Sequence, residues 1–253
     1  MGWAARRRFI ILFILGAIAV AFLIILLISA LYKTPSCTDG IQNQEEMGID
    51  CGGQCSYFCA GDLQPPTVLF TKLLQNDGRT DIIAEVENKN TEAAAKNVPY
   101  RIALYGSGQS FLGELSGTLD LPSRTIVPVY VPGVVAGNQK IVSAFLEIET
   151  SAPQWFALPA GSLIVPVVLN IMQTGSASSP RIEATLANPS TATLSNVQAV
   201  VLVRDVRQTV IAASRTVVPA IPADGRTAVT FTWNNAFQGI PASIEVVSVI
   251  SIP

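Results

Sequence analysis

The sequence predicts a mainly β protein with an N-terminal transmembrane helix, a small Cys-rich segment and two tandem β-sandwich domains. Three observations support this prediction. An apolar run without charge occupies residues 9–31, all four cysteines lie within residues 37–59, and short runs rich in Val, Ile and Thr fill most of the remainder. We expect a cytoplasmic tip at 1–8, the helix at 9–31, the Cys-rich segment at 37–59, and sandwiches at 66–150 and 162–253.

The apolar run FIILFILGAIAVAFLIILLISAL at residues 9–31 has one polar member, Ser29. As a helix it would be about 35 Å long, enough to cross a hydrocarbon core of about 30 Å. Three arginines precede it and Lys33 follows it, while Trp3 and Tyr32 suit the two membrane interfaces. We therefore expect a single-pass plasma-membrane protein that contacts the lipid bilayer through residues 9–31, with a cytoplasmic N-terminus and extracytoplasmic C-terminal domains.

The alternative to this anchor is a cleaved signal peptide. Its apolar core would span about 7–15 residues and precede a small-x-small site, whereas Ser29-Ala30-Leu31 is a poor cleavage site. Four basic residues and no acidic one lie in 1–33, so residues 34–253 carry 12 basic and 18 acidic side chains. This acidic exterior, and the formal charge of −2 of the whole chain, argue against a nucleic-acid partner.

The cysteines Cys37, Cys51, Cys55 and Cys59 lie in a stretch too polar to build a core. An even number of cysteines outside the cytoplasm predicts two disulfides, and the sequence allows three pairings. Zinc bound by four thiolates is the alternative, but the C-x3-C-x3-C spacing and an oxidising compartment disfavour it.

Oxygen-bearing side chains between the first two cysteines suggest a cation site. Asp39, Asn43, Glu45 and Asp50 offer the ligand type that Ca²⁺ requires, so weak calcium binding is the one cofactor that we consider. The segment lacks the regular D-x-D-x-D-G pattern of an EF-hand loop. The alternative is a disulfide-tied stalk whose acidic side chains are solvated.

The motif C-x-D-G-I-Q-N-Q-x-E-x-G-x-D-C-G-G-x-C, here Cys37 to Cys55, resembles a short motif of secreted and surface proteins. It is particularly similar to that of uncharacterised single-pass surface proteins of candidate-phylum bacteria. In those proteins a membrane helix, this motif and two β domains follow in the same order. The resemblance implies architecture and location, and it implies no activity.

Beyond a linker at residues 61–66, short alternating runs separated by Asn, Gly, Pro and Asp predict two series of strands. The expected strands are 68–74, 81–88, 97–105, 111–121, 125–131 and 141–149, then 163–172, 181–188, 196–205, 210–218, 227–233 and 243–250. We expect a brief turn at Thr91–Lys96 and a hairpin loop at 173–180.

The two series repeat one pattern, in which Asn88 aligns with Asn188. The alternating residues Val98, Tyr100, Ile102 and Leu104 match Val197, Ala199, Val201 and Val203 at an offset of 99. Matched alternation predicts one buried face and the same register in both copies. The pattern also resembles FxLYD- and CARDB-type modules of cell-envelope proteins. That resemblance implies two tandem immunoglobulin-like domains and places no binding residue.

Catalytic patterns are missing from the sequence. The chain has no histidine, which excludes Ser-His-Asp and Cys-His catalysis, and neither G-x-S-x-G, S-x-x-K nor G-x-x-x-x-G-K-[ST] occurs. Glu85 and Glu87 alternate on a strand face that we expect to be solvated. We therefore expect no enzyme.

Trp155 and Phe156, between the two copies, are candidates for contacting a partner, and the alternative is that they pack at the joint between the domains. The expected function is that of a non-catalytic scaffold or adhesion protein of the cell envelope. Its partner would be an envelope or surface protein or a glycan. The alternative function is an accessory or sensory subunit of a membrane protein complex.

Overall fold

The structure, a computed structural model, describes residues 2–31, 36–43, 45–76, 78–149 and 154–252. The chain divides into two compact units, residues 1–55 and residues 56–253. Tyr32 and Lys33, which we expected beside the membrane, lie outside the described residues.

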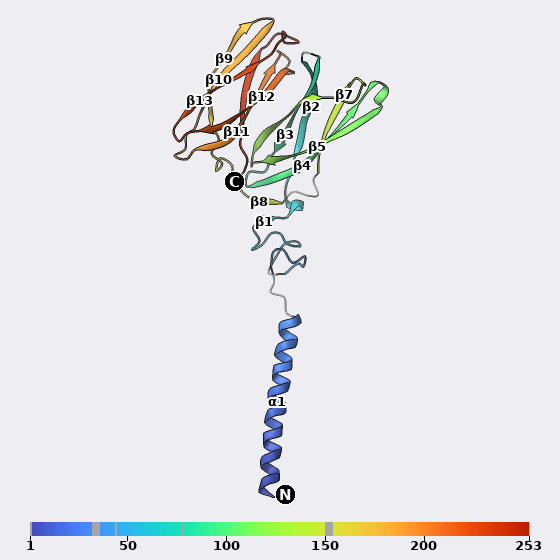
Figure 1. Cartoon of the computed structure of the whole chain (residues 1–253), viewed down its shortest axis with the longest axis vertical. Coiled ribbons are helices and arrows are strands. Elements are labelled where there is room, and N and C mark those ends of the chain that lie inside the picture. Colours follow the sequence, from blue (N-terminus) through green and yellow to red (C-terminus); the bar gives the residue numbers. More distant parts are fainter. Residues whose placement is uncertain (1, 32–35, 44, 77, 150–153, 253) are drawn as a thin grey trace. The chain divides into compact units, whose positions relative to one another are not determined.

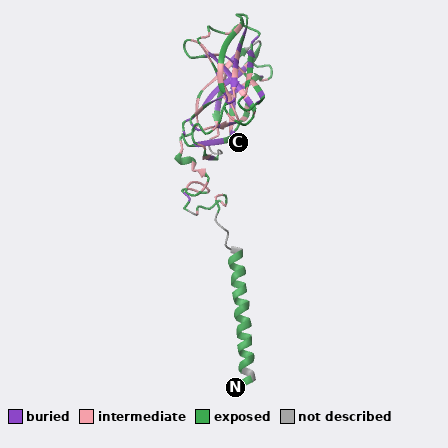
Figure 2. Ribbon diagram, turned by 90° about the vertical axis from the view of Figure 1, so that its left-hand side faces the viewer, coloured by how far each residue is buried: buried purple, intermediate pink, exposed green. Residues whose placement is uncertain are grey.

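The first unit begins with α1 (Trp3–Leu31), one continuous helix of 29 residues (Figure 1). Large apolar side chains from Phe9 to Ile28 are exposed around it, so the helix is green along most of its length in Figure 2. Because apolar residues surround the axis on every side, the helix has no polar face to turn to water. Its stretch Arg6–Ser29 is long and apolar enough to be a membrane span or a signal sequence.

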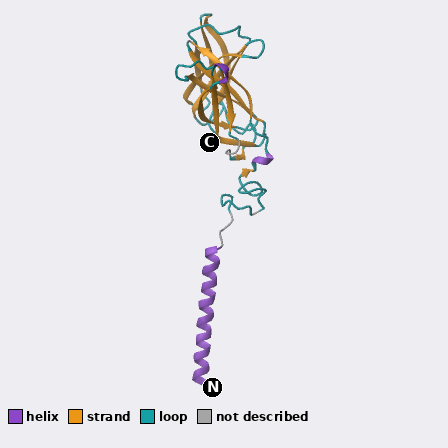
Figure 3. Ribbon diagram, turned by 90° about the vertical axis from the view of Figure 1, so that its right-hand side faces the viewer, coloured by secondary structure: helices purple, strands orange, loops and turns teal. Residues whose placement is uncertain are grey.

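The described part of residues 36–55 forms turns and bends, without a regular helix or strand (Figure 3). Its one ladder-like contact is an isolated antiparallel bridge between Gly48 and Cys51. With so few apolar side chains to bury, this segment depends on disulfides and on polar contacts for its shape.

The second unit is built of strands, and all twelve expected strands are confirmed, with ends shifted by a few residues. They are β2 (Thr67–Asn76), β3 (Arg79–Asn88), β4 (Ala93–Tyr105), β5 (Phe111–Leu121), β6 (Thr125–Val134) and β7 (Ser143–Ile148), then β9 (Val167–Ser176), β10 (Ser179–Ala187), β11 (Leu194–Arg204), β12 (Val210–Ile221), β13 (Arg226–Thr232) and β14 (Ser243–Val249). The expected hairpin loop is shorter than 173–180, because β9 and β10 pair as far as Ser176 and Ser179.

Two further strands, β1 (Tyr57–Phe58) and β8 (Trp155–Ala157), pair with each other, and β8 also pairs with Ala93–Ala95. The turn expected at Thr91–Lys96 is therefore wrong, since its alanines begin β4. Alanine has a low strand propensity, but these three side chains are fully buried where β8 joins the sheet, and packing outweighs propensity. Two short 3-10 turns, η1 (Ala60–Asp62) and η2 (Ser107–Gln109), complete the described elements.

The strands form two sets of sheets with the same order. The first sheet pair consists of β2-β3-β6 and β7-β4-β5, the latter extended by β8 and β1; the second consists of β9-β10-β13 and β14-β11-β12. Neighbouring strands in every sheet are antiparallel. Two sheets that contribute side chains to one interior must face each other, and the cores show this for both pairs.

Each sheet pair encloses its own core, which appears as the purple interior of the strand region in Figure 2. Ile82 of β3, Ile102 of β4 and Val129 of β6 belong to the first core. Ile182 of β10, Val201 of β11 and Phe231 of β13 belong to the second. The residues of β11 and β13 that belong to the second core alternate along their strands, as the sequence pattern predicts.

Asn88 and Asn188, which align in the sequence, make matching contacts. Each side chain is buried, and its Nδ2 donates to three backbone carbonyls. The acceptors for Asn88 are Ala93, Leu121 and Pro122, at 2.8, 3.2 and 3.0 Å. Those for Asn188 are Ala192, Ile221 and Pro222, at 2.7, 3.2 and 2.9 Å. In both sheet pairs one amide thus ties the loop after a strand to a loop on the opposite sheet.

Candidate functional site

All four cysteines are oxidised, which confirms the expectation of two disulfides. Cys37 and Cys55 are bonded, with Cα atoms 5.6 Å apart, and Cys51 and Cys59 are disulfide-bonded as well. The thiolate zinc alternative is therefore wrong for this state of the chain, because a sulfur in a disulfide is no longer a thiolate ligand.

The acidic residues considered as calcium ligands accept hydrogen bonds from the backbone around them. Asp50 accepts from the N–H groups of Asp39 and Gly40 at 2.9–3.1 Å. Asp39 accepts from the N–H of Ile41 at 2.9 Å and from the side-chain amide of Asn43 at 2.9 Å. Glu45 is exposed. Backbone N–H groups and the Asn43 amide thus donate to the two aspartate carboxylates, and these hydrogen bonds help to hold the loop together.

Glu46, which is not among the four predicted calcium ligands, is the buried acid of this segment, with 6% of its surface exposed. Its Oε2 accepts from the N–H groups of Asn43 and Asp50, both at 3.2 Å, and its Oε1 lies 3.1 Å from Cys55 Sγ. Cys37, Glu46 and Cys55 lie close enough to hold a metal, but both sulfurs belong to one disulfide. Glu45 and Glu46 are chemically identical, and the one sequence signal that separates them is the Cys37–Cys55 motif, which has Glu at position 46 and leaves position 45 open.

Trp155, one of the two candidates for contacting a partner, is only 3% exposed and belongs to the core of the first sheet pair. It lies on β8 opposite Phe58 and Ala95, so it packs within its own sheet pair and offers no exposed surface. Phe156, its neighbour, is half-buried. The aromatic segment between the two copies therefore stabilises the first sheet pair.

A joint connects the two sheet pairs through the outer faces of β2-β3-β6 and β12-β11-β14. Its apolar members form a buried cluster of their own, composed of Leu74, Ile83 and Tyr130 from the first pair and Val200, Leu202, Val210 and Ala213 from the second. At one side of this cluster, Arg204 Nη2 lies 2.5 Å from Glu85 Oε1, and the guanidinium carbon lies 5.6 Å from the centre of the Phe70 ring.

The expectation that Glu85 and Glu87 share a solvated face is wrong for Glu85, which is only 7% exposed. Its strand face is covered by β11, the strand that carries Arg204. Burial raises the pKa of Glu85 above its usual value; Arg204 opposes that effect and Glu245 adds to it. Glu87 is half-buried and pairs with Lys89 at 3.7 Å.

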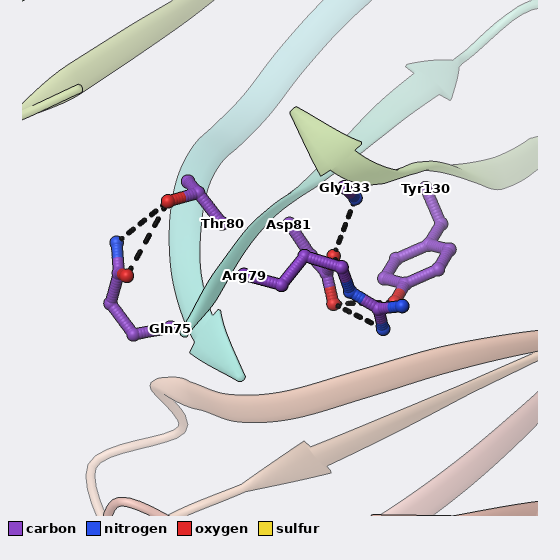
Figure 4. Close-up of polar contacts among 6 residues, drawn as sticks. All are labelled: Gln75, Arg79, Thr80, Asp81, Tyr130 and Gly133. Carbon is purple, nitrogen blue, oxygen red and sulfur yellow. Dashed lines mark hydrogen bonds and ion pairs between the residues drawn. The ribbon is translucent and has the colours of Figure 1, made fainter. Parts of the chain in front are cut away.

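Asp81, fully buried at the start of β3, is the centre of a second polar cluster (Figure 4). Its carboxylate accepts from Tyr130 Oη at 2.8 Å, from the N–H of Gly133 at 2.7 Å and from Arg79 Nε at 2.9 Å. A β-bulge between Thr80 and Ile82 leaves Asp81 without a partner residue on β6, and its side chain makes these contacts instead. Burial, and the hydrogen bond to Asp81, raise the pKa of Tyr130 well above its usual value.

A polar cleft of about 290 Å³ lies beside the joint, between the two sheet pairs. Tyr100 and Asp120 line it from the first sheet pair, and Gln198 and Arg215 from the second. Asp120 links the pairs, because its Oδ2 accepts from the N–H of Ile252 at 2.9 Å. Arg215 takes part in none of the salt bridges found among the described residues.

Tyr100 packs tightly against its neighbours in the cleft. Burial raises the pKa of Tyr100, and the charge of Arg215 opposes this effect, so the guanidinium lies near the phenol. Gly117 leaves room for the ring, since a Cβ at that position would collide with Tyr100 Oη. The strand pattern does not reveal this cleft, because its lining residues come from six strands, β4, β5, β6, β11, β12 and β14, whose spatial order the pattern leaves open.

No known family profile and no curated protein sequence matches the chain. Among solved structures, the structure of a beta-glucuronidase from glycoside hydrolase family 2 is similar at 14% identity and a TM-score of 0.21. The match covers 80% of this chain and 25% of that chain, so the chain spans about a quarter of the length of that protein. A similarity at this TM-score supports no conclusion about function.

Proposed function

We propose that the chain is a membrane-anchored, extracytoplasmic scaffold or adhesion protein of the cell envelope, without a catalytic role. In this proposal α1 is an uncleaved anchor with its N-terminus in the cytoplasm, and two tandem immunoglobulin-like β-sandwiches follow outside. The length and apolar surface of α1, and the arginines at 6–8, favour the anchor and its orientation. The disulfides fit an oxidising compartment.

The observation that supports a scaffold most directly is the joint between the sheet pairs. Domains on a flexible linker move independently, whereas a joint with a buried apolar cluster and a buried ion pair keeps one orientation. The surfaces of the two sheet pairs then stay in a constant arrangement, and so does the cleft that contains Arg215. A fixed composite surface suits binding and presentation of a partner.

The anchor and its orientation can be tested on the full chain in intact cells. Extracellular protease should degrade residues 34–253, and alkaline extraction should leave the undigested protein in the membrane. Mass spectrometry should find residues 1–33 still attached. A soluble protein that begins after residue 31 would contradict the anchor, and protection from external protease would contradict the orientation.

The role can be tested by crosslinking and mass spectrometry in the native membrane. A scaffold or adhesion protein should crosslink through residues 56–253 to envelope or surface components. Crosslinks confined to one membrane complex and to α1 would favour the alternative role of accessory subunit, for which Gly16 leaves open space on the helix. Substrate turnover by the purified protein would contradict the non-catalytic proposal.

A further inference from the structure

An exposed aromatic cluster lies on the outer face of the β7-β4-β5 sheet, away from the core. Tyr105 on β4 is flanked by Phe111 on β5 and Phe145 on β7, with both pairs of ring centres 5.8 Å apart and the planes at 69° and 71°. Phe111 is 61% exposed and Phe145 is 57% exposed. We call these three residues the aromatic face.

Strand register fixes the arrangement of this face. Tyr105 is the cross-strand partner of Phe111, and Ala103 is the partner of Phe145. The rings therefore span three neighbouring strands. The side chain of Ala103 is small, so it does not cover the Phe145 ring beside it. Isolated exposed apolar residues are ordinary, but two exposed phenylalanines in contact with one tyrosine form a contiguous apolar surface of the kind that binds a partner.

Charged groups surround the aromatic face and decide which partner fits. Arg101 lies on the same face of β4, two residues before Ala103, and forms ion pairs with Glu149 at 3.2 Å and Glu114 at 3.8 Å. Glu147, its partner on β7, adds a third carboxylate. One cation among three carboxylates leaves the surroundings negative, which disfavours anionic lipids, nucleic acids and acidic glycans.

A second copy of the chain is also a poor occupant. The face of the second sheet pair that corresponds in strand order, β14-β11-β12, is already covered in the joint, where Val200 and Leu202 supply aliphatic contacts. At the matching positions β4 carries Arg101 and Ala103, which lie beside the aromatic face. In a dimer built like the joint, the outer face of β10 from the second copy would cover the aromatic face. That face of β10 carries a salt bridge between Arg181 and Glu183 instead of aliphatic side chains.

From this combination we infer that the aromatic face binds a neutral carbohydrate chain. The C–H faces of sugar rings would stack on Phe111 and Phe145, and sugar hydroxyls would exchange hydrogen bonds with Arg101 and the carboxylates of Glu114 and Glu147. Neutral carbohydrate would be the ligand class of the proposed adhesion function. Carbohydrate binding rests on that proposal only for the location of residues 34–253 outside the cell. Binding itself can therefore be measured independently of topology.

The test uses the full chain in nanodiscs of uncharged lipid, probed with an array of neutral oligosaccharides that includes cellohexaose, chitohexaose and mannohexaose. Isothermal titration should detect binding to at least one of them. Phe111→Ala and Phe145→Ala should each weaken it about tenfold. Phe145→Tyr should retain binding, and so should Met172→Ala, a matched control that is 54% exposed on β9.

Four outcomes would overturn the inference. They are no binding to any neutral oligosaccharide, binding by both alanine variants as tight as that of the wild type, preferential binding of polygalacturonate, or a dimer that Phe111→Ala dissociates. Because both phenylalanines are exposed, the variants should melt at the wild-type temperature, and circular dichroism would check this. If the protease test placed residues 34–253 inside the cell, the proposed function would fail while the carbohydrate result stood.

Discussion

Arg204 Nη2 lies 2.5 Å from Glu85 Oε1, and this contact joins residues 119 positions apart in the chain. The side chains of Arg204 and Glu85 are only 16% and 10% exposed. Water therefore cannot replace either charged group as the partner of the other. The pair lies beside the buried apolar cluster of the joint. The contribution of the ion pair to stability therefore depends on both partners being present, because each charge can be buried only while the other neutralises it.

Removing one partner of this ion pair should be more damaging than removing both. Arg204→Met leaves Glu85 buried without its cation and should lower the free energy of unfolding by about 3 kcal/mol. The double variant Glu85→Leu, Arg204→Met should recover most of that loss. Urea unfolding of the full chain in micelles, followed by tryptophan fluorescence, would measure both. A double variant as unstable as Arg204→Met would show that the charges themselves hold the joint.

Glu85 should make stability depend on pH with a definite sign. Its folded-state pKa lies above the usual glutamate pKa of 4.5, so the folded protein binds the proton more tightly than the unfolded chain does. The resulting stabilisation is complete below about pH 4.5 and is lost as pH rises through the folded-state pKa. Relative to Glu85→Gln, the wild type should therefore become less stable over that range. A difference in unfolding free energy that is constant from pH 4 to 7 would contradict this.

Tyr130→Phe should destabilise the chain through the Asp81 cluster. The variant leaves Asp81 Oδ2 without the 2.8 Å hydrogen bond from the phenol, and loss of a partner for a buried carboxylate costs about 1–3 kcal/mol. Tyr100→Phe is the matched control, because the hydroxyl of Tyr100 forms no hydrogen bond among those found for the described residues. Equal unfolding midpoints for the two variants would exclude a stabilising role for the Tyr130 hydroxyl.

The two asparagines allow a comparison between the sheet pairs. Asn88→Ala and Asn188→Ala each remove one Nδ2 and leave three carbonyls without that donor, so each should cost about 2–3 kcal/mol. Asn88→Asp and Asn188→Asp should cost more, because a carboxylate oxygen would then face carbonyl oxygens. Thermal unfolding would measure all four variants. A tolerated aspartate at either position would mean that the loop rearranges and that the contacts are incidental.

The alternation of apolar residues predicted the strands well because each sheet pair buries one face of every strand. It failed for Glu85 because alternation separates the two faces of a strand but does not say whether the outer face is covered as well. A usable signal was present in Ala199–Val203, a continuous apolar run, since a strand buried on both faces shows such a run instead of strict alternation.

The aromatic face and the cleft that contains Arg215 were harder to predict for a related reason. Tyr105, Phe111 and Phe145 come from three strands and meet only through the register of β7-β4-β5. Arg215 and Tyr100 meet only because the joint fixes the two sheet pairs against each other. Sequence spacing carries no trace of either relationship. The disulfides, by contrast, follow from residue type and compartment and needed no knowledge of the fold.

The hydrogen bond between the N–H of Ile252 and Asp120 has a mechanical consequence. Ile252 follows the last strand of the second sheet pair, yet it is fastened to β5 of the first. A pull on the C-terminus therefore loads the first sheet pair directly, as well as through the linker between the copies. Gln238 Nε2, which donates to the carbonyl of Gln75 at 2.8 Å, offers a parallel attachment elsewhere on the joint. Tension on a tethered molecule of this design is divided over several bonds, so the two halves resist separation together.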